Sequence, residues 1–261
     1  MLTELLYEDV IGALAEVEKI AFENNSNTQF VVMGISDIEE YKVKGLTCHE
    51  KRDINIDMVK ALRLNLELEE LKIIESTLSN QRLSSIDLSK QLQTLEIVNN
   101  DSFTIEFEAS IVPILSICGK SLKKLVLEKF RFIDLDYVGR QCKSLTVLGL
   151  SHILQYGKIK NLNRDSFSNL EELDFINEYG ARIFHNIIKQ LLFNSCNIQY
   201  LHLQRIECLD DILLTQVINK NNLSSLVSLT LDQCHTVSGE WVSGKNILFV
   251  MDSIVIHSKI W

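Results

Sequence analysis

A short phrase, leucine-x-x-leucine-x-leucine, recurs along most of this 261-residue chain and constrains its fold more than any other feature. Two clear copies are Ser-Leu-Lys-Lys-Leu-Val-Leu at 121–127 and Ser-Leu-Thr-Val-Leu-Gly-Leu at 144–150. With Ile or Met accepted as a first residue, the phrase starts at Leu68, Leu92, Leu122, Leu145, Leu170, Ile198, Leu226 and Met251. The intervals between these starts fall in one narrow band, with a mean of about 26 residues.

The spacing within the phrase has a simple physical meaning. Positions 4 and 6 point to one side of a short strand and positions 3, 5 and 7 to the other, because successive side chains alternate. Parallel neighbouring strands need a crossover of about a dozen residues, which the linking segments supply. Stacked units then share a core that one unit cannot form alone. Phrase and period together are the leucine-rich-repeat pattern, which predicts an α/β solenoid, a curved horseshoe with parallel strands on the concave face and helices on the convex face.

The repeats are expected to form one continuous array at 46–261, preceded at 1–45 by a capping helix and a degenerate first repeat. One proline and ten glycines leave no flexible linker in the chain. Apolar residues at helical spacing predict the capping helix over 3–24. Two closely spaced frames, starting at Phe30 and Ile38, both fit the phrase, and the choice between them stays open. The frame at Leu83 also fits, but the period favours Leu92.

Helices are expected in several of the linking segments. Pro113 falls in the first turn of one of them, where its missing N–H is tolerated, and Gly119 is placed to end that helix. Asp210 is expected to cap the last helix. The segment 153–168 lacks a helical stripe and is predicted to be irregular. The expected helices lie at 54–64, 109–118, 135–142 and 181–193.

Cysteines mark several repeats. Cys118, Cys142 and Cys196 stand shortly before a repeat start, and the run 229–240 reads Leu-Thr-Leu-Asp-Gln-Cys-His-Thr-Val-Ser-Gly-Glu. In these features the chain resembles the cysteine-containing leucine-rich repeats of F-box proteins, the substrate receptors of Skp–cullin–F-box ubiquitin ligases. The resemblance covers residues 65–257. It departs from the family at position 9 of the repeat, where Cys or Asn is replaced by Phe130, Ile153, Glu178 and Ile206.

The resemblance implies a non-catalytic protein-recognition module, a substrate receptor or adaptor for a ubiquitin ligase. No intact F-box is found, because Leu2-Thr-Glu-Leu-Leu6 lacks the Leu-Pro start of that motif. The alternative is a generic leucine-rich-repeat scaffold or inhibitor with no ligase link. The last strand of the chain offers unpaired backbone groups through which copies could associate.

Composition and charge exclude several kinds of partner. The net charge is −9, and no Lys/Arg cluster of the kind that a nucleic-acid groove needs is present. The acidic balance also argues against anionic membranes. No apolar run is long enough to span a bilayer, and Glu4, Glu8 and Asp9 interrupt the first apolar run, which argues against a signal peptide. We therefore expect a cytoplasmic or nuclear protein whose six cysteines are reduced and buried.

Catalytic and metal-binding patterns are missing from the sequence. Cys48-His49 and Cys234-His235 are merely adjacent and lack ligand spacing, and no phosphate-binding loop occurs. The sequence predicts neither an enzyme, nor a metal site, nor a cofactor.

Function is therefore expected on the concave face. An acidic stripe of Glu172, Asp174 and Asp232 flanks Tyr200 and His202 there and could hold a basic peptide. The simpler interpretation is a row of ordinary solvated strand residues. The candidate partner-binding residues are Glu96, Lys124, Glu128, Glu172, Asp174, Tyr200, His202, Gln204, Asp232 and His257.

Overall fold

The computed structural model divides into two compact units, residues 1–129 and 130–261, which we describe one at a time. For three segments, 19–23, 45–49 and 253–257, only the strand backbone is described. The other residues that the structure describes are 68–76, 90–99, 105–157, 163, 165–177, 185–221 and 225–238.

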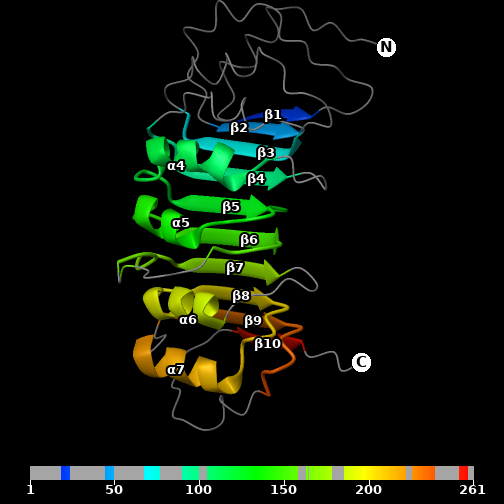
Figure 1. The fold of residues 1–261 in the computed structure, drawn as a ribbon, viewed down its shortest axis with the longest axis vertical. Coiled ribbons are helices and arrows are strands. Elements are labelled where there is room, and N and C mark those ends of the chain that lie inside the picture. The colour runs from blue at the N-terminus through cyan, green and yellow to red at the C-terminus, as the bar shows by residue number, and fades with distance from the viewer. Residues whose placement is uncertain are drawn as a thin grey trace, which may run out of the picture. The chain divides into compact units, whose positions relative to one another are not determined.

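The N-terminal unit contains parallel strands in sequence order (Figure 1). Each strand pairs in parallel with the next one along the chain. The register sets the fourth residues of successive repeats side by side, as in Leu71, Leu95 and Leu125. The strands are β1 (Lys19–Glu23), β2 (Gly45–His49), β3 (Glu70–Ser76), β4 (Thr94–Asn99) and β5 (Lys124–Glu128).

Strands β1 and β2 correct the prediction for the start of the chain. The helix predicted over 3–24 is wrong at 19–23, which are strand. Pairing sets Ile20 beside Leu46 and Leu46 beside Leu71, so the same period extends further toward the N-terminus than the repeat phrase predicts. The rest of the predicted helix, the frames at Phe30 and Ile38, the helix at 54–64 and the frame at Leu83 lie outside the described residues. The preferred Leu92 frame is confirmed by β4.

The helix predicted at 109–118 begins earlier than expected. A π-helical turn, Phe107–Ile111, leads directly into α4 (Val112–Cys118). Pro113 falls in the first turn of α4, as predicted, where its missing N–H is tolerated. The helix ends before Gly119 as predicted, although Gly119 keeps right-handed geometry at φ −55. Just after the helix, Ser121 Oγ donates to the carbonyl of Cys118, the last residue of α4, at 2.8 Å.

The C-terminal unit repeats the same construction. Its five strands are again parallel neighbours in sequence order. They are β6 (Val147–Ile153), β7 (Glu172–Asn177), β8 (Tyr200–Gln204), β9 (Ser228–Asp232) and β10 (Ser253–His257). The helices are α5 (Leu135–Gln141), α6 (His185–Asn194) and α7 (Asp211–Asn221), drawn beside the strands in Figure 1.

The helix starts of this unit follow from side-chain caps. Asp134 accepts from the Tyr137 N–H at 3.1 Å, and Asp210 accepts from the Leu213 N–H at 2.6 Å, so the predicted cap at Asp210 is confirmed. Helix α6 confirms the prediction over 185–193, while 181–184 lie outside the described residues. The described part of 153–168 contains no helix, in agreement with the prediction.

Inward positions of the strands, the fourth and sixth of each repeat, form the core of each unit. Leu95 and Ile97 in the N-terminal unit, and Leu173 and Phe175 in the C-terminal unit, are at most 1% exposed. Apolar residues of the helices are buried with them, among them Ile114, Leu115, Val138, Ile187, Leu191 and Leu213. The ninth-position residues Phe130, Ile153 and Ile206 are also fully buried, so the departures from the resembled pattern enlarge the core.

Backbone hydrogen bonds recur at the same position of several repeats. The carbonyl of Glu69 accepts from the N–H groups of both Gln93 and Thr94, at 2.7 and 2.9 Å. The carbonyl of Gln93 accepts in the same way from the next repeat, and in the C-terminal unit Thr146, Glu171 and Gln199 do likewise. Each unit is thus an α/β structure whose parallel strands are linked by one recurring pattern of hydrogen bonds.

A buried asparagine ends two of the strands. Asn99 lies opposite Ser76, and its side chain both donates to the Ile105 carbonyl (2.9 Å) and accepts from the Ile105 N–H (3.3 Å). Asn177 lies opposite Ile153, where the register skips one residue. Ser76 and Ile153 are the ninth residues of their repeats, whereas Asn99 and Asn177 are the eighth residues of theirs. Each asparagine therefore lies opposite a ninth-position residue, although it comes one residue earlier in its own repeat. Glu178, the ninth residue of the repeat that starts at Leu170, lies outside the described residues.

Candidate protein-binding surface

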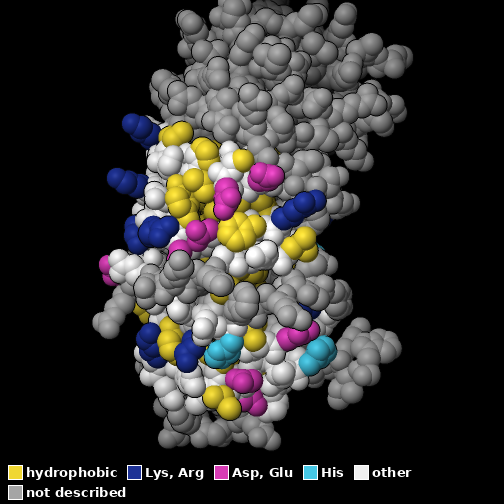
Figure 2. Space-filling model, in the orientation of Figure 1, with side chains coloured by type: hydrophobic (Ala, Val, Ile, Leu, Met, Phe, Trp, Pro, Cys, Tyr) yellow, Lys and Arg dark blue, Asp and Glu magenta, His cyan; other side chains and the backbone are white. Residues whose placement is uncertain are grey.

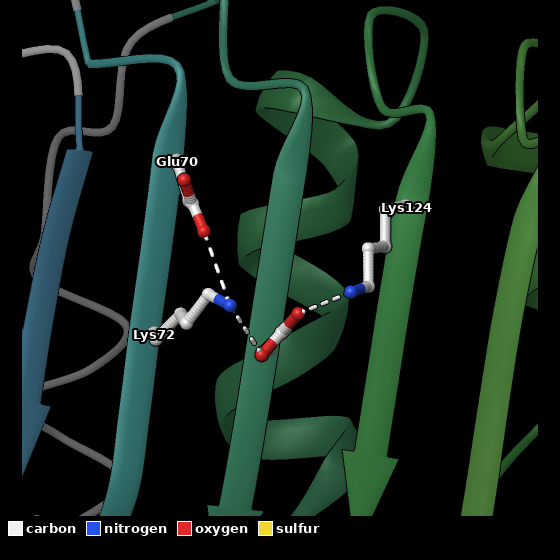
Figure 3. Close-up of polar contacts among 4 residues, drawn as sticks. Glu70, Lys72 and Lys124 are labelled. Atoms are coloured by element: carbon white, nitrogen blue, oxygen red, sulfur yellow. Dashed lines mark ion pairs between the residues drawn. The ribbon is translucent and has the colours of Figure 1, made fainter. Parts of the chain in front are cut away.

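The outward positions of the strands, the third, fifth and seventh of each repeat, form one face in each unit, where charged and polar side chains lie among apolar ones such as Val98 and Ile176. We call it the outward strand face. Alternation along the strand keeps these side chains away from the buried leucines, and the strands show alternating buried and part-exposed residues. Figure 3 shows this arrangement in the N-terminal unit, with charged side chains in front of the strands and a helix behind them.

Four residues on this face of the N-terminal unit form an ion-pair network (Figure 3). Lys72 Nζ lies 3.2 Å from Glu70 Oε1 and 3.0 Å from Glu96 Oε2. The other oxygen of Glu96, Oε1, lies 2.6 Å from Lys124 Nζ. Because the register sets β4 between β3 and β5, Glu96 joins a lysine from each neighbouring strand.

The network is partly shielded from water. Glu96 and Lys72 are 16% and 20% exposed, whereas Lys124 is 39% exposed. Burial raises the pKa of Glu96, but the hydrogen bonds from Lys124 and Lys72 lower it more, so the pKa lies below 4.5. Burial lowers the pKa of Lys72, but the bonds to Glu96 and Glu70 prevail and hold it above 10.5. Glu96 and Lys72 are therefore charged at neutral pH.

Sequence reasoning missed half of this network. Glu96 and Lys124 were predicted site residues, whereas Glu70 and Lys72 were not, although they fill positions 3 and 5 of the repeat that starts at Leu68. Glu128, also predicted, lies on β5 at the far end of the same face. Among the described residues no ion pair holds Glu128.

In the C-terminal unit the outward strand face brings together a histidine and an aspartate. His202 Nδ1 lies 2.8 Å from Asp174 Oδ1, on the adjacent and register-matched strand. This hydrogen bond raises the pKa of His202 above 6.5, against the lowering effect of burial, and the charges of Asp174 and Asp232 add to the rise. The structure thus brings Asp174 and His202 together, and the charge of Asp232 on β9 acts on the same histidine.

The remaining predicted residues surround this pair. Tyr200 is 48% exposed and lies register-matched beside Glu172, which is also exposed. Gln204 Nε2 donates to Asp232 Oδ2 at 2.6 Å. The Cα of His257 pairs with that of Asp232, but β10 is described only by its backbone. We call the outward residues of β7–β9 the Tyr200 surface: Glu172, Asp174, Ile176, Tyr200, His202, Gln204, Ser228, Thr230 and Asp232.

Two lysines lie on the helical side of the C-terminal unit. Lys189 Nζ and Lys220 Nζ lie 5.3 and 4.4 Å from the centre of the Phe193 ring. Figure 2 shows Lys or Arg side chains on this side of the unit, with Asp or Glu and His side chains near them. These lysines stabilise the helix pair by cation–π contact, and they lie apart from the outward strand positions.

The cysteines fill mainly structural places. Burial raises the pKa of the Cys118 thiol to about 12 and that of Cys234 to about 11, so neither is a thiolate at neutral pH. Cys142 is also buried. The prediction of buried thiols is wrong for Cys196, which is exposed, and Cys208 is only part-buried. In the described part of the chain, no three His, Cys, Asp or Glu residues come together as metal ligands.

Comparison with known proteins adds no family to this description. No protein-family model matches the chain, and no curated protein sequence matches it. Among the described residues, no helix is long and apolar enough to cross a membrane.

Proposed function

We propose that this chain is a leucine-rich-repeat protein that recognises another protein through its outward strand face. In this proposal the parallel strands line the concave side of a curved solenoid. Support comes from the recurring hydrogen bonds to the second-position carbonyls of five repeats and from strand pairing that keeps the repeat interval. Asn177 Nδ2 also donates to the Arg205 carbonyl at 3.2 Å, which joins one repeat to the next as a repeat array requires.

The observation that carries the binding role is the composition of the outward strand face. Tyr200 is a large aromatic residue that is 48% exposed, and the exposed carboxylate of Glu172 lies beside it on the adjacent strand β7. Tyrosine is enriched at protein interfaces because its ring adds contact area and its hydroxyl adds a hydrogen bond. Side chains fixed on adjacent strands also lose little freedom on binding, which favours affinity.

A ubiquitin-ligase substrate receptor is the more specific form of this proposal. Cys234 supports it, since this ninth-position cysteine is buried and its Sγ donates to the Leu203 carbonyl of the preceding repeat at 3.5 Å. Cys118 and Cys142, the cysteines before two repeat starts, are buried as well. The competing form is a scaffold or inhibitor with the same binding face and no ligase partner.

Affinity capture from a cell lysate, with the bound proteins identified by mass spectrometry, tests both forms. The bait is the full chain, compared with a Glu172→Lys/Asp174→Lys variant on the outward strand face and a Lys189→Glu/Lys220→Glu variant on the helical side. Circular dichroism checks that each variant folds. We expect the first variant to lose partners that the second retains. Recovery of Skp and cullin subunits would favour the ligase receptor. Capture of the same proteins by the wild-type chain and by both variants would refute the binding role.

A further inference from the structure

The two outward strand faces differ in how their carboxylates are neutralised. In the N-terminal unit Glu70 and Glu96 are held by lysines at 2.6–3.2 Å. On the Tyr200 surface none of the outward positions is Lys or Arg. Glu172 has no ion pair with another described residue, and the Asp232 carboxylate accepts from the neutral amide of Gln204. Among the described residues no Lys or Arg pairs with the carboxylates of Glu172 and Asp232, so this part of the described surface keeps their negative charge.

We propose that the Tyr200 surface binds an extended basic segment of the partner protein and holds an arginine of that segment between Tyr200 and Glu172. This inference rests on the proposed function and names the chemistry of the partner at one part of the face. The occupant is a protein segment because a sheet face of this kind offers side chains along several parallel strands rather than an enclosed pocket.

Arginine fits this place better than other cations. A guanidinium group is planar, stacks on an aromatic ring and binds a carboxylate through two parallel hydrogen bonds. Tyr200 and Glu172 are register-matched on adjacent strands, so their backbones lie about 4.8 Å apart. The exposed ring and the exposed carboxylate can therefore contact one side chain together. Ser228, on the other side of Tyr200, is small and leaves room for the arginine stem.

A second cation is expected near Asp232. Glu172 and Asp232 are separated by two strand spacings and four residue rises, which amounts to about 16 Å. In an extended peptide, residues four apart lie on the same side about 13 Å from each other, and long side chains cover the difference. The surface thus matches a segment with two basic residues spaced four apart.

The Asp174–His202 pair makes this recognition depend on pH. When His202 is protonated it neutralises part of the surface, and when it is neutral Asp174 keeps its full charge. The charged groups facing His202 are Asp174 on β7 and Asp232 on β9, with Glu172 and Tyr200 beside them on β7 and β8. Binding of a basic segment should therefore weaken as pH falls and His202 takes up its proton.

The probe is a fluorescent Gly-Ser peptide with two arginines spaced four apart, and its affinity for the full chain is measured by anisotropy. Replacing the arginines by citrulline, which is neutral but has the same shape, should weaken binding about tenfold. Lysines should bind more weakly than arginines, because an ammonium group cannot bind a carboxylate through two parallel bonds. The arginine peptide should also bind more weakly at pH 5.5 than at pH 8.

Variants then locate the site. Glu172→Gln and Tyr200→Leu should each weaken arginine-peptide binding about five- to tenfold, whereas Glu207→Gln, which removes an equal charge from an exposed loop, should change it less than about twofold. If Tyr200→Leu fails to fold, Glu172→Gln decides the site. Equal binding of the arginine and citrulline peptides, or equal effects of Glu172→Gln and Glu207→Gln, would overturn the inference. Lysate capture could still be lost in the Glu172→Lys/Asp174→Lys variant while the arginine and citrulline peptides bind equally. That result would refute this inference alone and leave the proposed function standing.

Discussion

Glu96→Gln tests the ion-pair network of the N-terminal unit most directly. The substitution keeps the shape of the side chain but removes the charge that joins Lys72 and Lys124. The pair with Lys72 is well shielded, at 16% and 20% exposure, and contributes about 1–1.5 kcal/mol, the lower end for charge-assisted bonds. The pair with Lys124 is 39% exposed on the lysine side, so solvent screening reduces it to about 0.5 kcal/mol. Because Gln keeps one acceptor oxygen, we expect a net loss of about 1–2 kcal/mol in the free energy of unfolding.

Urea unfolding followed by circular dichroism measures this loss, with an unchanged slope showing that only stability has changed. The matched control is Glu128→Gln, on the same face and without an ion pair to a described residue, which should cost less than about 0.5 kcal/mol. A double-mutant cycle with Lys124→Gln should give a coupling energy of about 0.5 kcal/mol. Equal losses for Glu96→Gln and Glu128→Gln would refute the network as a source of stability.

The network also has a defined pH dependence. The pKa of Glu96 is lowered on folding, so its contribution is fully present above the ordinary value of 4.5 and is lost as pH falls through the lowered folded value. The stability difference between the wild type and Glu96→Gln should therefore shrink in acid. A difference that stays constant from neutral pH to strongly acid pH would contradict the lowered pKa.

Three further substitutions test other parts of the account by urea unfolding. Leu173→Ala removes an inward side chain that is 1% exposed and should cost about 2–5 kcal/mol, with loss of β7 packing; a cost below about 1 kcal/mol would contradict its place in the core. Asn99→Ala leaves both backbone groups of Ile105 unsatisfied and should cost about 2–3 kcal/mol, whereas Asn169→Ala, at an exposed hydrogen bond, should cost under about 1 kcal/mol. The raised pKa of His202 contributes stability that is fully present below pH 6.5 and is lost as pH rises through the folded value, so His202→Gln should abolish this dependence; an unchanged pH profile would contradict the Asp174–His202 pair.

The repeat phrase predicted the strands and their buried, inward-facing residues well. Period and alternation are properties of the backbone, so they placed the buried leucines of β3 to β9 and the strand β10 correctly. They failed at β1, because an apolar stripe at helical spacing runs through 3–24 and the short alternation of Ile20 and Phe22 is weak beside it. That Ile20 and Leu46 are one repeat apart is visible only once the pairing is known.

The arrangement of the outward-facing residues depends on backbone and side-chain conformations that the repeat period does not encode. His152 adopts a left-handed conformation, at φ 55, and is the residue that the β6–β7 register skips, which places Asn177 opposite Ile153. The same left-handed conformation follows three other strands, at Lys129, Arg205 and Gln233. The sequence placed Asp174 and His202 on adjacent strands, but the 2.8 Å contact between His202 Nδ1 and Asp174 Oδ1 depends on rotamers that a repeat phrase does not specify.

Site-specific photo-crosslinking tests the central claim, that the outward strand face binds a protein partner. Thr230→benzoylphenylalanine places the photoreactive group among the outward residues of β9, beside His202. Ile212→benzoylphenylalanine places it on α7, where the side chain is 68% exposed. After irradiation in a cell lysate, the account predicts a discrete covalent adduct from position 230 and none of that mass from position 212. The same adduct from position 212 alone would contradict it.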